Sequence, residues 1–202
     1  VALLIDNSGM GLQSIREAAA AFISRLRGAA QIAITTTGGR NIRLLDFTDS
    51  AAALVGAINR TFASNQAGSF LVEGLAEAAR DFTAREVARP VIVSIGVEGE
   101  ENSSMRATEA LAAIQRSRAQ VYLIRLGRPV IGQSNPVEAM RGESNADEAT
   151  QANSVFGQAP SRSGGRIDQL SAHTGIPKLL DQIAVELVGQ YAITYSSADL
   201  GA

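Results

Sequence analysis

The sequence contains no cysteine and no tryptophan among its 202 residues, and aromatic residues make up only 4%. The lack of cysteine excludes disulfide bonds, thiolate metal sites and cysteine nucleophiles. The scarcity of aromatic side chains argues against carbohydrate platforms and surfaces on which nucleic-acid bases stack. No apolar run approaches the roughly 20 residues that a membrane-spanning helix needs. A net charge of −2 leaves no basic footprint for nucleic acid or an anionic membrane.

The residues that are present fit one globular domain with a sizeable core. Hydrophobic residues make up 46% of the chain and charged residues 19%. The sequence opens directly in an apolar strand, at residues 1–5. We therefore expect residues 1–202 to form a single domain that is truncated on its N-terminal side, so the lack of a targeting signal tells little.

Short β-rich segments alternate with amphipathic ones. Strands are expected over residues 1–5, 31–37, 42–47, 91–95 and 121–126. Segments whose apolar residues recur at helical spacing separate them, and this alternation predicts an α/β fold. That fold is a doubly wound, mostly parallel sheet with helices on both faces. The tight turn at residues 38–41 predicts that the strand at 42–47 is antiparallel and lies at or near an edge.

Two segments depart from this alternation. Residues 127–162 are rich in Gly, Ser, Asn, Gln and Pro and have no sustained period, so we expect a long surface loop, disordered or partner-binding. Residues 191–195 alternate cleanly between two faces. Residues 190–202 are therefore expected to form an extra C-terminal strand at the edge of this sheet or the start of a following domain.

Polar residues follow two of the predicted strands. Residues 6–11 come directly after the first strand, residues 96–104 follow the strand at 91–95, and Gly68-Ser69 begins a helix between them. Ligands of such sheets collect at the carboxyl ends of strands where the strand order reverses. Carboxylate and hydroxyl oxygens that converge there suit a hard cation such as Mg²⁺. The same residue types also dominate ordinary turns and helix caps, and we expect the acidic residues at 98, 100 and 101 to form a solvated loop that could rim the ligand face.

Three motifs resemble those of von Willebrand factor type A domains. Asp6-x-Ser8-x-Met10 resembles the Asp-x-Ser-x-Ser signature of that family, and residues 68–75 are similar to its second motif, Gly-x-Thr-x-Leu followed by Ala-Leu. Residues 91–102 are similar to the third motif, a strand that ends in Thr-Asp-Gly. Residues 184–195 look like the end of a bacterial branch, the "VWFA-related" domains common in acidobacterial proteins. The resemblance spans nearly the whole chain.

This resemblance implies a six-stranded sheet, a metal-ion-dependent adhesion site that takes Mg²⁺, and adhesion to a protein partner without catalysis. An acidic residue of the partner would complete the metal shell. It also implies a secreted, periplasmic or cell-surface location. The implied metal ligands are Asp6, Ser8, Ser69 and Glu98.

The sequence departs from the family at each motif. Met10 replaces a serine that would ligate the metal directly, and a thioether is a poor ligand for Mg²⁺. Ser69 keeps the hydroxyl of the family's threonine, whereas Glu98 stands where aspartate is expected, with Val97 interpreted as one extra residue in that turn. We therefore expect a degenerate site that is assembled in shape and binds metal weakly or not at all.

Two other functions are consistent with the residues. A serine hydrolase would use Ser8 with His173, the only histidine, and needs these side chains within hydrogen-bond reach. The nucleophile elbow Gly-x-Ser-x-Gly is absent, because position 6 is aspartate. The other alternative is a structural domain of a larger surface protein. A dinucleotide site at Gly9-x-Gly11 is rejected, because Asp6 would face the pyrophosphate.

Overall fold

A computed structural model describes the chain except for residues 10, 67, 98–99, 128–145 and 191–202. Its strands are β1 (Ala2–Ile5), β2 (Ile32–Thr36), β3 (Ile42–Thr48), β4 (Val91–Val97), β5 (Gln120–Leu126) and β6 (Arg166–Leu170). Its helices are α1 (Leu12–Arg25), α2 (Ala51–Asn59), α3 (Leu71–Ala84), α4 (Ala107–Ser117), α6 (Ala146–Ser163) and α7 (Ile176–Gly189), with the short 3₁₀ helix η1 (His173–Gly175) before α7.

The strands form one six-stranded sheet in the order β3-β2-β1-β4-β5-β6. β1 pairs in parallel with both β2 and β4, and the parallel pairing continues through β5 to β6. Only the pairing of β3 with β2 is antiparallel, and β3 lies at one end of this strand order. The predicted fold class and the predicted antiparallel edge strand are therefore confirmed.

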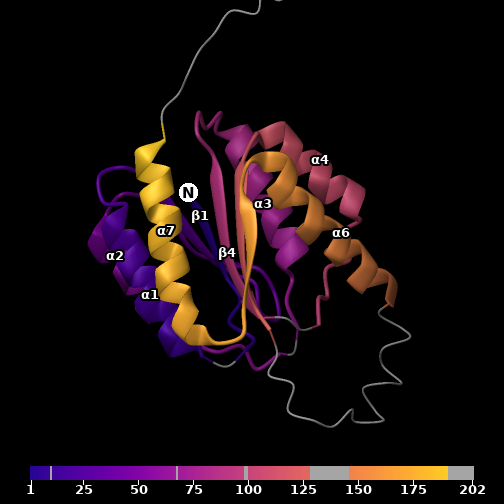
Figure 1. The fold of residues 1–202 in the computed structure, drawn as a ribbon, viewed down its shortest axis with the longest axis horizontal. Coiled ribbons are helices and arrows are strands. Elements are labelled where there is room, and N and C mark those ends of the chain that lie inside the picture. The colour runs from indigo at the N-terminus through magenta and orange to yellow at the C-terminus, as the bar shows by residue number, and fades with distance from the viewer. Residues whose placement is uncertain (10, 67, 98–99, 128–145, 191–202) are drawn as a thin grey trace, which may run out of the picture.

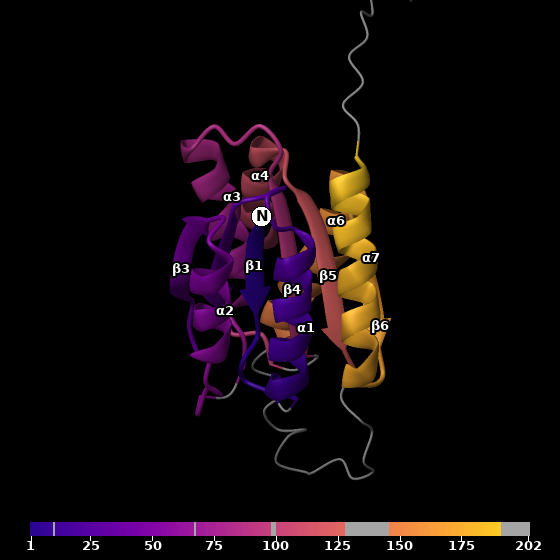
Figure 2. The same cartoon turned by 90° about the vertical axis from the view of Figure 1, so that its left-hand side faces the viewer.

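Helices cover both faces of the sheet (Figure 1 and Figure 2). α1, α2 and α7 lie on one face and α3, α4 and α6 on the other, each layer with its own apolar core. β1 shows how the sheet serves both cores, because successive side chains of a strand point to opposite faces. Leu3 and Ile5 pack with Phe22 in the first core, and Leu4 packs with Phe82 in the second.

Helix α6 corrects the expectation of a loop over residues 127–162. It covers residues 146–163 and packs on the sheet through buried Ala152, Val155, Phe156 and Ala159. These four residues follow the spacing of one helix face, and their burial stabilises the helix despite polar residues at most other positions. The prediction failed because it weighed the polar composition and Pro160 above this short apolar stripe. Residues 128–145 lie outside the described residues, so the loop stays a prediction there.

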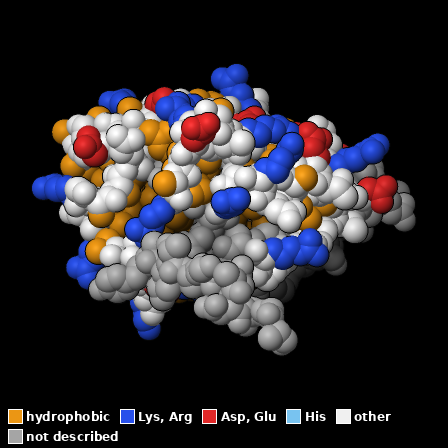
Figure 3. Space-filling model, turned by 90° about the horizontal axis from the view of Figure 1, so that it is seen from above, with side chains coloured by type: hydrophobic (Ala, Val, Ile, Leu, Met, Phe, Trp, Pro, Cys, Tyr) orange, Lys and Arg blue, Asp and Glu red, His pale blue; other side chains and the backbone are white. Residues whose placement is uncertain are grey.

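Val1 and Gln190, the first and last residues that the structure describes, lie near the amino ends of the parallel strands. The amino group of Val1 donates a hydrogen bond to the carbonyl of Gln31 at 2.7 Å, and Val1 and Gln190 border the same small pocket. Figure 3 looks onto this end and shows Lys and Arg side chains between hydrophobic patches. The strand predicted over 191–195 lies outside the described residues and stays a prediction. Within the described ranges, no helix is long and apolar enough to cross a membrane.

Candidate functional site

Asp6 lies at the carboxyl end of β1, where the strand order reverses between β1 and β4. Its backbone N–H donates to the carbonyl of Ile95 at 2.8 Å, and the residue is only 3% exposed. One carboxylate oxygen accepts from the backbone N–H of Ser8 at 2.9 Å and from the Ser8 hydroxyl at 2.6 Å. The other accepts from the backbone N–H of Val97 at 3.4 Å. Three donors of the protein therefore satisfy this buried carboxylate.

Ser69 precedes α3 and joins two loops. It forms isolated β-bridges with Gly38 and with Glu101, and its backbone N–H donates to the carbonyl of Glu100 at 2.8 Å. Its hydroxyl lies 3.2 Å from the hydroxyl of Thr37, and both residues are buried. The hydroxyl of Ser69 thus stands beside a second hydroxyl, which the analysis of the sequence did not assign to the site.

Gly38 brings Ser8 and Ser69 close to each other. A Cβ atom at Gly38 would lie 2.5 Å from the backbone nitrogen of Ser8, a distance that only glycine avoids. The Asn7 side chain reinforces this contact, because its carbonyl oxygen accepts from the Gly38 N–H at 3.1 Å and its amide donates to the carbonyl of Phe62 at 2.6 Å. Ser8 and Ser69 therefore flank the same glycine, next to Asp6.

Val97 occupies a different place from the one that the sequence suggested. It is the last residue of β4, in register with Leu126 of β5, and is therefore not an extra residue of the turn. Its side chain lies against the backbone of Gly9, where a Cβ atom would be 2.6 Å from a Val97 methyl group. An apolar group therefore borders the Asp6 loop on the β4 side. Met10 and Glu98 lie outside the described residues, so their roles stay predictions.

Glu101 is a second carboxyl group near this edge of the sheet, and its residue is half-buried. It accepts hydrogen bonds from the backbone N–H of Val72, in the first turn of α3, at 3.1 Å and from the Ser103 hydroxyl. Burial raises the pKa of Glu101 to about 7, although these hydrogen bonds and the charge of Arg125 lower it; the charge of Asp6 raises it slightly. The expectation of a solvated acidic loop is therefore wrong for Glu101. The sequence holds no signal for this contact, because its partner lies 29 residues away.

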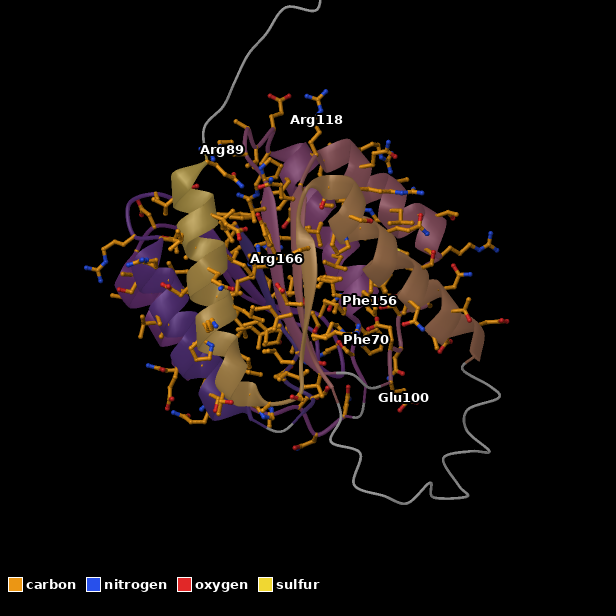
Figure 4. All side chains as sticks on the ribbon, in the orientation of Figure 1. Phe70, Arg89, Glu100, Arg118, Phe156 and Arg166 are labelled. Carbon is orange, nitrogen blue, oxygen red and sulfur yellow. The ribbon has the colours of Figure 1, made fainter. Side chains whose placement is uncertain are left out.

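A small cavity of about 170 Å³ adjoins Glu101 between β5 and α6. The guanidinium of Arg125 lies over the ring of Phe156 at 4.3 Å and borders this cavity with Glu100 and Asn153. Figure 4 shows Phe156 and Glu100 toward the end of the molecule where β4 and β5 finish. The contact between Arg125 and Phe156 was not predicted from the sequence, because the segment that holds Phe156 was expected to be a loop.

His173 lies against the start of α1. A Cβ atom at Gly11, where φ is +86°, would lie 2.0 Å from the imidazole ring. The hydroxyl of Ser8 donates to the carboxylate of Asp6 at 2.6 Å. This hydrogen bond joins Ser8 to Asp6 and gives no support to the predicted pairing of Ser8 with His173.

The donor set fits a divalent cation only in part. Among the described residues, no group of three or more His, Cys, Asp or Glu side chains could hold a metal ion. Oxygens of Asp6, Ser8 and Ser69 are the chemical type that Mg²⁺ prefers. A cation here would have to share the Asp6 carboxylate with its three hydrogen-bond donors and would face the methyl groups of Val97.

No family model and no curated protein matches the sequence. Solved structures do match. A von Willebrand factor type A protein from Catenulispora acidiphila is 19% identical with a TM-score of 0.59, over 93% of this chain and 42% of that one. BatB from Bacteroides thetaiotaomicron is 17% identical with a TM-score of 0.60, over 94% of this chain and 100% of that one. Proximal thread matrix protein 1 of the mussel byssus, with a zinc-occupied MIDAS motif, is 15% identical with a TM-score of 0.65, over 91% of this chain and 44% of that one.

This chain thus spans less than half of the Catenulispora and mussel proteins and the whole of the BatB structure. At these identities the likeness concerns the fold. The strand order, the antiparallel edge strand and the helices on both faces agree with it. The chain has the fold of von Willebrand factor type A domains.

Proposed function

We propose that this domain is a non-catalytic protein-interaction module whose adhesion-type metal site is degenerate. The observation that carries the proposal is that hydrogen-bond donors of the protein already satisfy the carboxylate of Asp6. Its carboxylate is buried and accepts three hydrogen bonds from Ser8 and Val97. This hydrogen bonding supports the proposal, because the protein's own donors already contact the carboxylate oxygens that a cation would need.

Asp6, Ser8 and Ser69 would hold a divalent cation, with Glu98 as the fourth ligand. Mg²⁺ would supply a positive charge to which an acidic residue of the partner binds. Mg²⁺ dehydrates reluctantly, so each protein ligand that is lost lowers the affinity. Met10 lacks the hydroxyl of the family's third position, and Val97 places methyl groups beside Gly9. Both features favour weak binding or none.

The loops at the same end of the sheet offer a contact surface that needs no metal. Phe62 is 72% exposed, and the guanidinium of Arg16 lies 5.9 Å from the centre of its ring. Its carbonyl accepts from Asn7, which fixes the loop beside the Asp6 turn. An exposed aromatic residue held next to an arginine is the kind of group that dominates protein interfaces. We therefore place the partner over this end of the molecule.

The assignment of a non-catalytic role rests on Ser8, whose hydroxyl is committed to Asp6. The location that we propose is extracytoplasmic, on the resemblance to type A domains; one similar structure is that of an aerotolerance-related membrane protein from Bacteroides fragilis. A secreted or surface position would bring the loops around Phe62 into contact with partner proteins.

Titration calorimetry with Mg²⁺ and with Mn²⁺ tests the degenerate site. We expect no saturable heat at micromolar metal from the wild-type domain or from Asp6→Ala. The variant Met10→Ser restores the family's hydroxyl and is expected to gain affinity, because an oxygen ligand replaces a thioether. Micromolar binding by the wild type that Asp6→Ala abolishes would contradict the proposal.

A further inference from the structure

A pocket lies at the opposite end of the molecule, between the last turns of α4 and α6. Its volume is about 330 Å³, within the range of small-molecule sites. Figure 4 places Arg118, on its rim, at the end of the molecule away from Glu100. The apolar part of its wall consists of Leu111, Ile114, Ala119 and Ala159.

The rim of this pocket is positively charged. Arg118 and Arg162 are exposed and border it together with Gln115 and Ser163. None of the described residues that line the pocket is acidic. Neither arginine forms an ion pair with any residue that the structure describes. By contrast, Arg80 forms an ion pair at 2.6 Å with Glu109 of α4. Two guanidinium groups are therefore available to a ligand.

The helix ends alone do not account for both arginines. A cation near a helix C-terminus interacts favourably with the exposed carbonyls, and Arg116 already supplies one in the last turn of α4. Arg118 follows at the C-cap with φ 56°, a left-handed conformation in which glycine is the unstrained residue. The backbone conformation at this position therefore does not explain why an arginine stands here.

We propose that this pocket binds an anionic amphiphile, with a short aliphatic chain against Leu111 and Ala159 and a carboxylate or phosphate head group between Arg118 and Arg162. Guanidinium groups pair with such oxyanions through two parallel N–H donors. The apolar wall binds the chain by removing it from water. The site is independent of the turn after β1 and of the metal chemistry there.

Calorimetric titration of the domain with octanoate and with octyl phosphate, below their micelle concentrations, tests the proposal; octanol is the uncharged probe. We expect saturable binding of one or both anions, and the head group that binds more tightly identifies the natural class. Arg118→Gln and Arg162→Gln should each weaken binding about tenfold, because each removes one charged hydrogen-bonding partner.

Arg116→Gln is the matched control, since it lies on the same helix and does not line the pocket. It should leave the affinity unchanged, and octanol should bind at least about tenfold more weakly than octanoate. Melting curves of the three variants establish that each is folded. The proposal is overturned if neither anion binds saturably, if octanol binds as tightly as the anions, or if Arg116→Gln weakens binding as much as the rim variants.

Discussion

Asp6, which is buried, and Glu101, which is half-buried, are two carboxyl groups near the same edge of the sheet, and the protein compensates them differently. Asp6 follows β1 and receives three hydrogen bonds from its own turn and from β4. Glu101 receives two, from the start of α3 and from Ser103, and burial raises its pKa to about 7. The comparison shows that the turn after β1 and the end of β4 together supply three donors to one carboxyl group, whereas the loop after β4 supplies fewer to the other.

Removing the better-compensated carboxylate should have the larger effect. Asp6→Ala leaves the hydroxyl of Ser8 and the N–H groups of Ser8 and Val97 without their acceptor. We expect the free energy of unfolding to fall by about 2–4 kcal/mol, measured by urea denaturation. Asp49→Ala, at an exposed position, is the control and should change it by less than about 0.5 kcal/mol. Equal effects of the two substitutions would break the comparison.

Neutralising Glu101 should have a smaller effect of opposite sign. The folded state keeps a proton on Glu101 between its ordinary pKa of 4.5 and about 7. Stability from that proton is fully present below pH 4.5 and is lost as the pH rises through about 7. Glu101→Gln keeps an acceptor for Val72 and carries no charge, so it should raise the free energy of unfolding by roughly 1 kcal/mol at pH 8.

The same variant should be no more stable than the wild type at pH 4, where Glu101 is protonated in both folded and unfolded chains to a large extent. Denaturation curves at the two pH values measure this difference. Glu109→Gln, a surface residue paired with Arg80, is the matched control and should show no such dependence on pH. A stability gain from Glu101→Gln that is equal at both pH values would show that burial does not raise this pKa.

The sequence predicted the architecture because its signals are local. The run at residues 91–97 is apolar apart from Ser94, as suits a strand buried on both faces, and the short turn before Ile42 favours an antiparallel neighbour. Helix α6 escaped prediction because Val155 and Phe156 are its only large buried apolar residues, and tertiary packing stabilises it more than its composition indicates.

The candidate site was predicted only as far as single motifs allow. Ser8 and Ser69 both adjoin Gly38, and Ser8 hydrogen-bonds to Asp6; their role as metal ligands stays a prediction. The contacts of Glu101 with α3 and of Val97 with Gly9 join segments that are far apart in the sequence, and no local pattern encodes them. The place of Val97 was predicted wrongly because the sequence does not show whether this residue ends strand β4 or begins the turn after it.

The most direct test of the account is a crystal structure of the wild-type domain soaked in micromolar Mn²⁺, whose anomalous scattering locates the metal. The account predicts no anomalous peak within coordination distance of Asp6, with the Ser8 hydroxyl still donating to that carboxylate as it does at 2.6 Å. A well-occupied Mn²⁺ ion ligated by Asp6, Ser8 and Ser69 would contradict it.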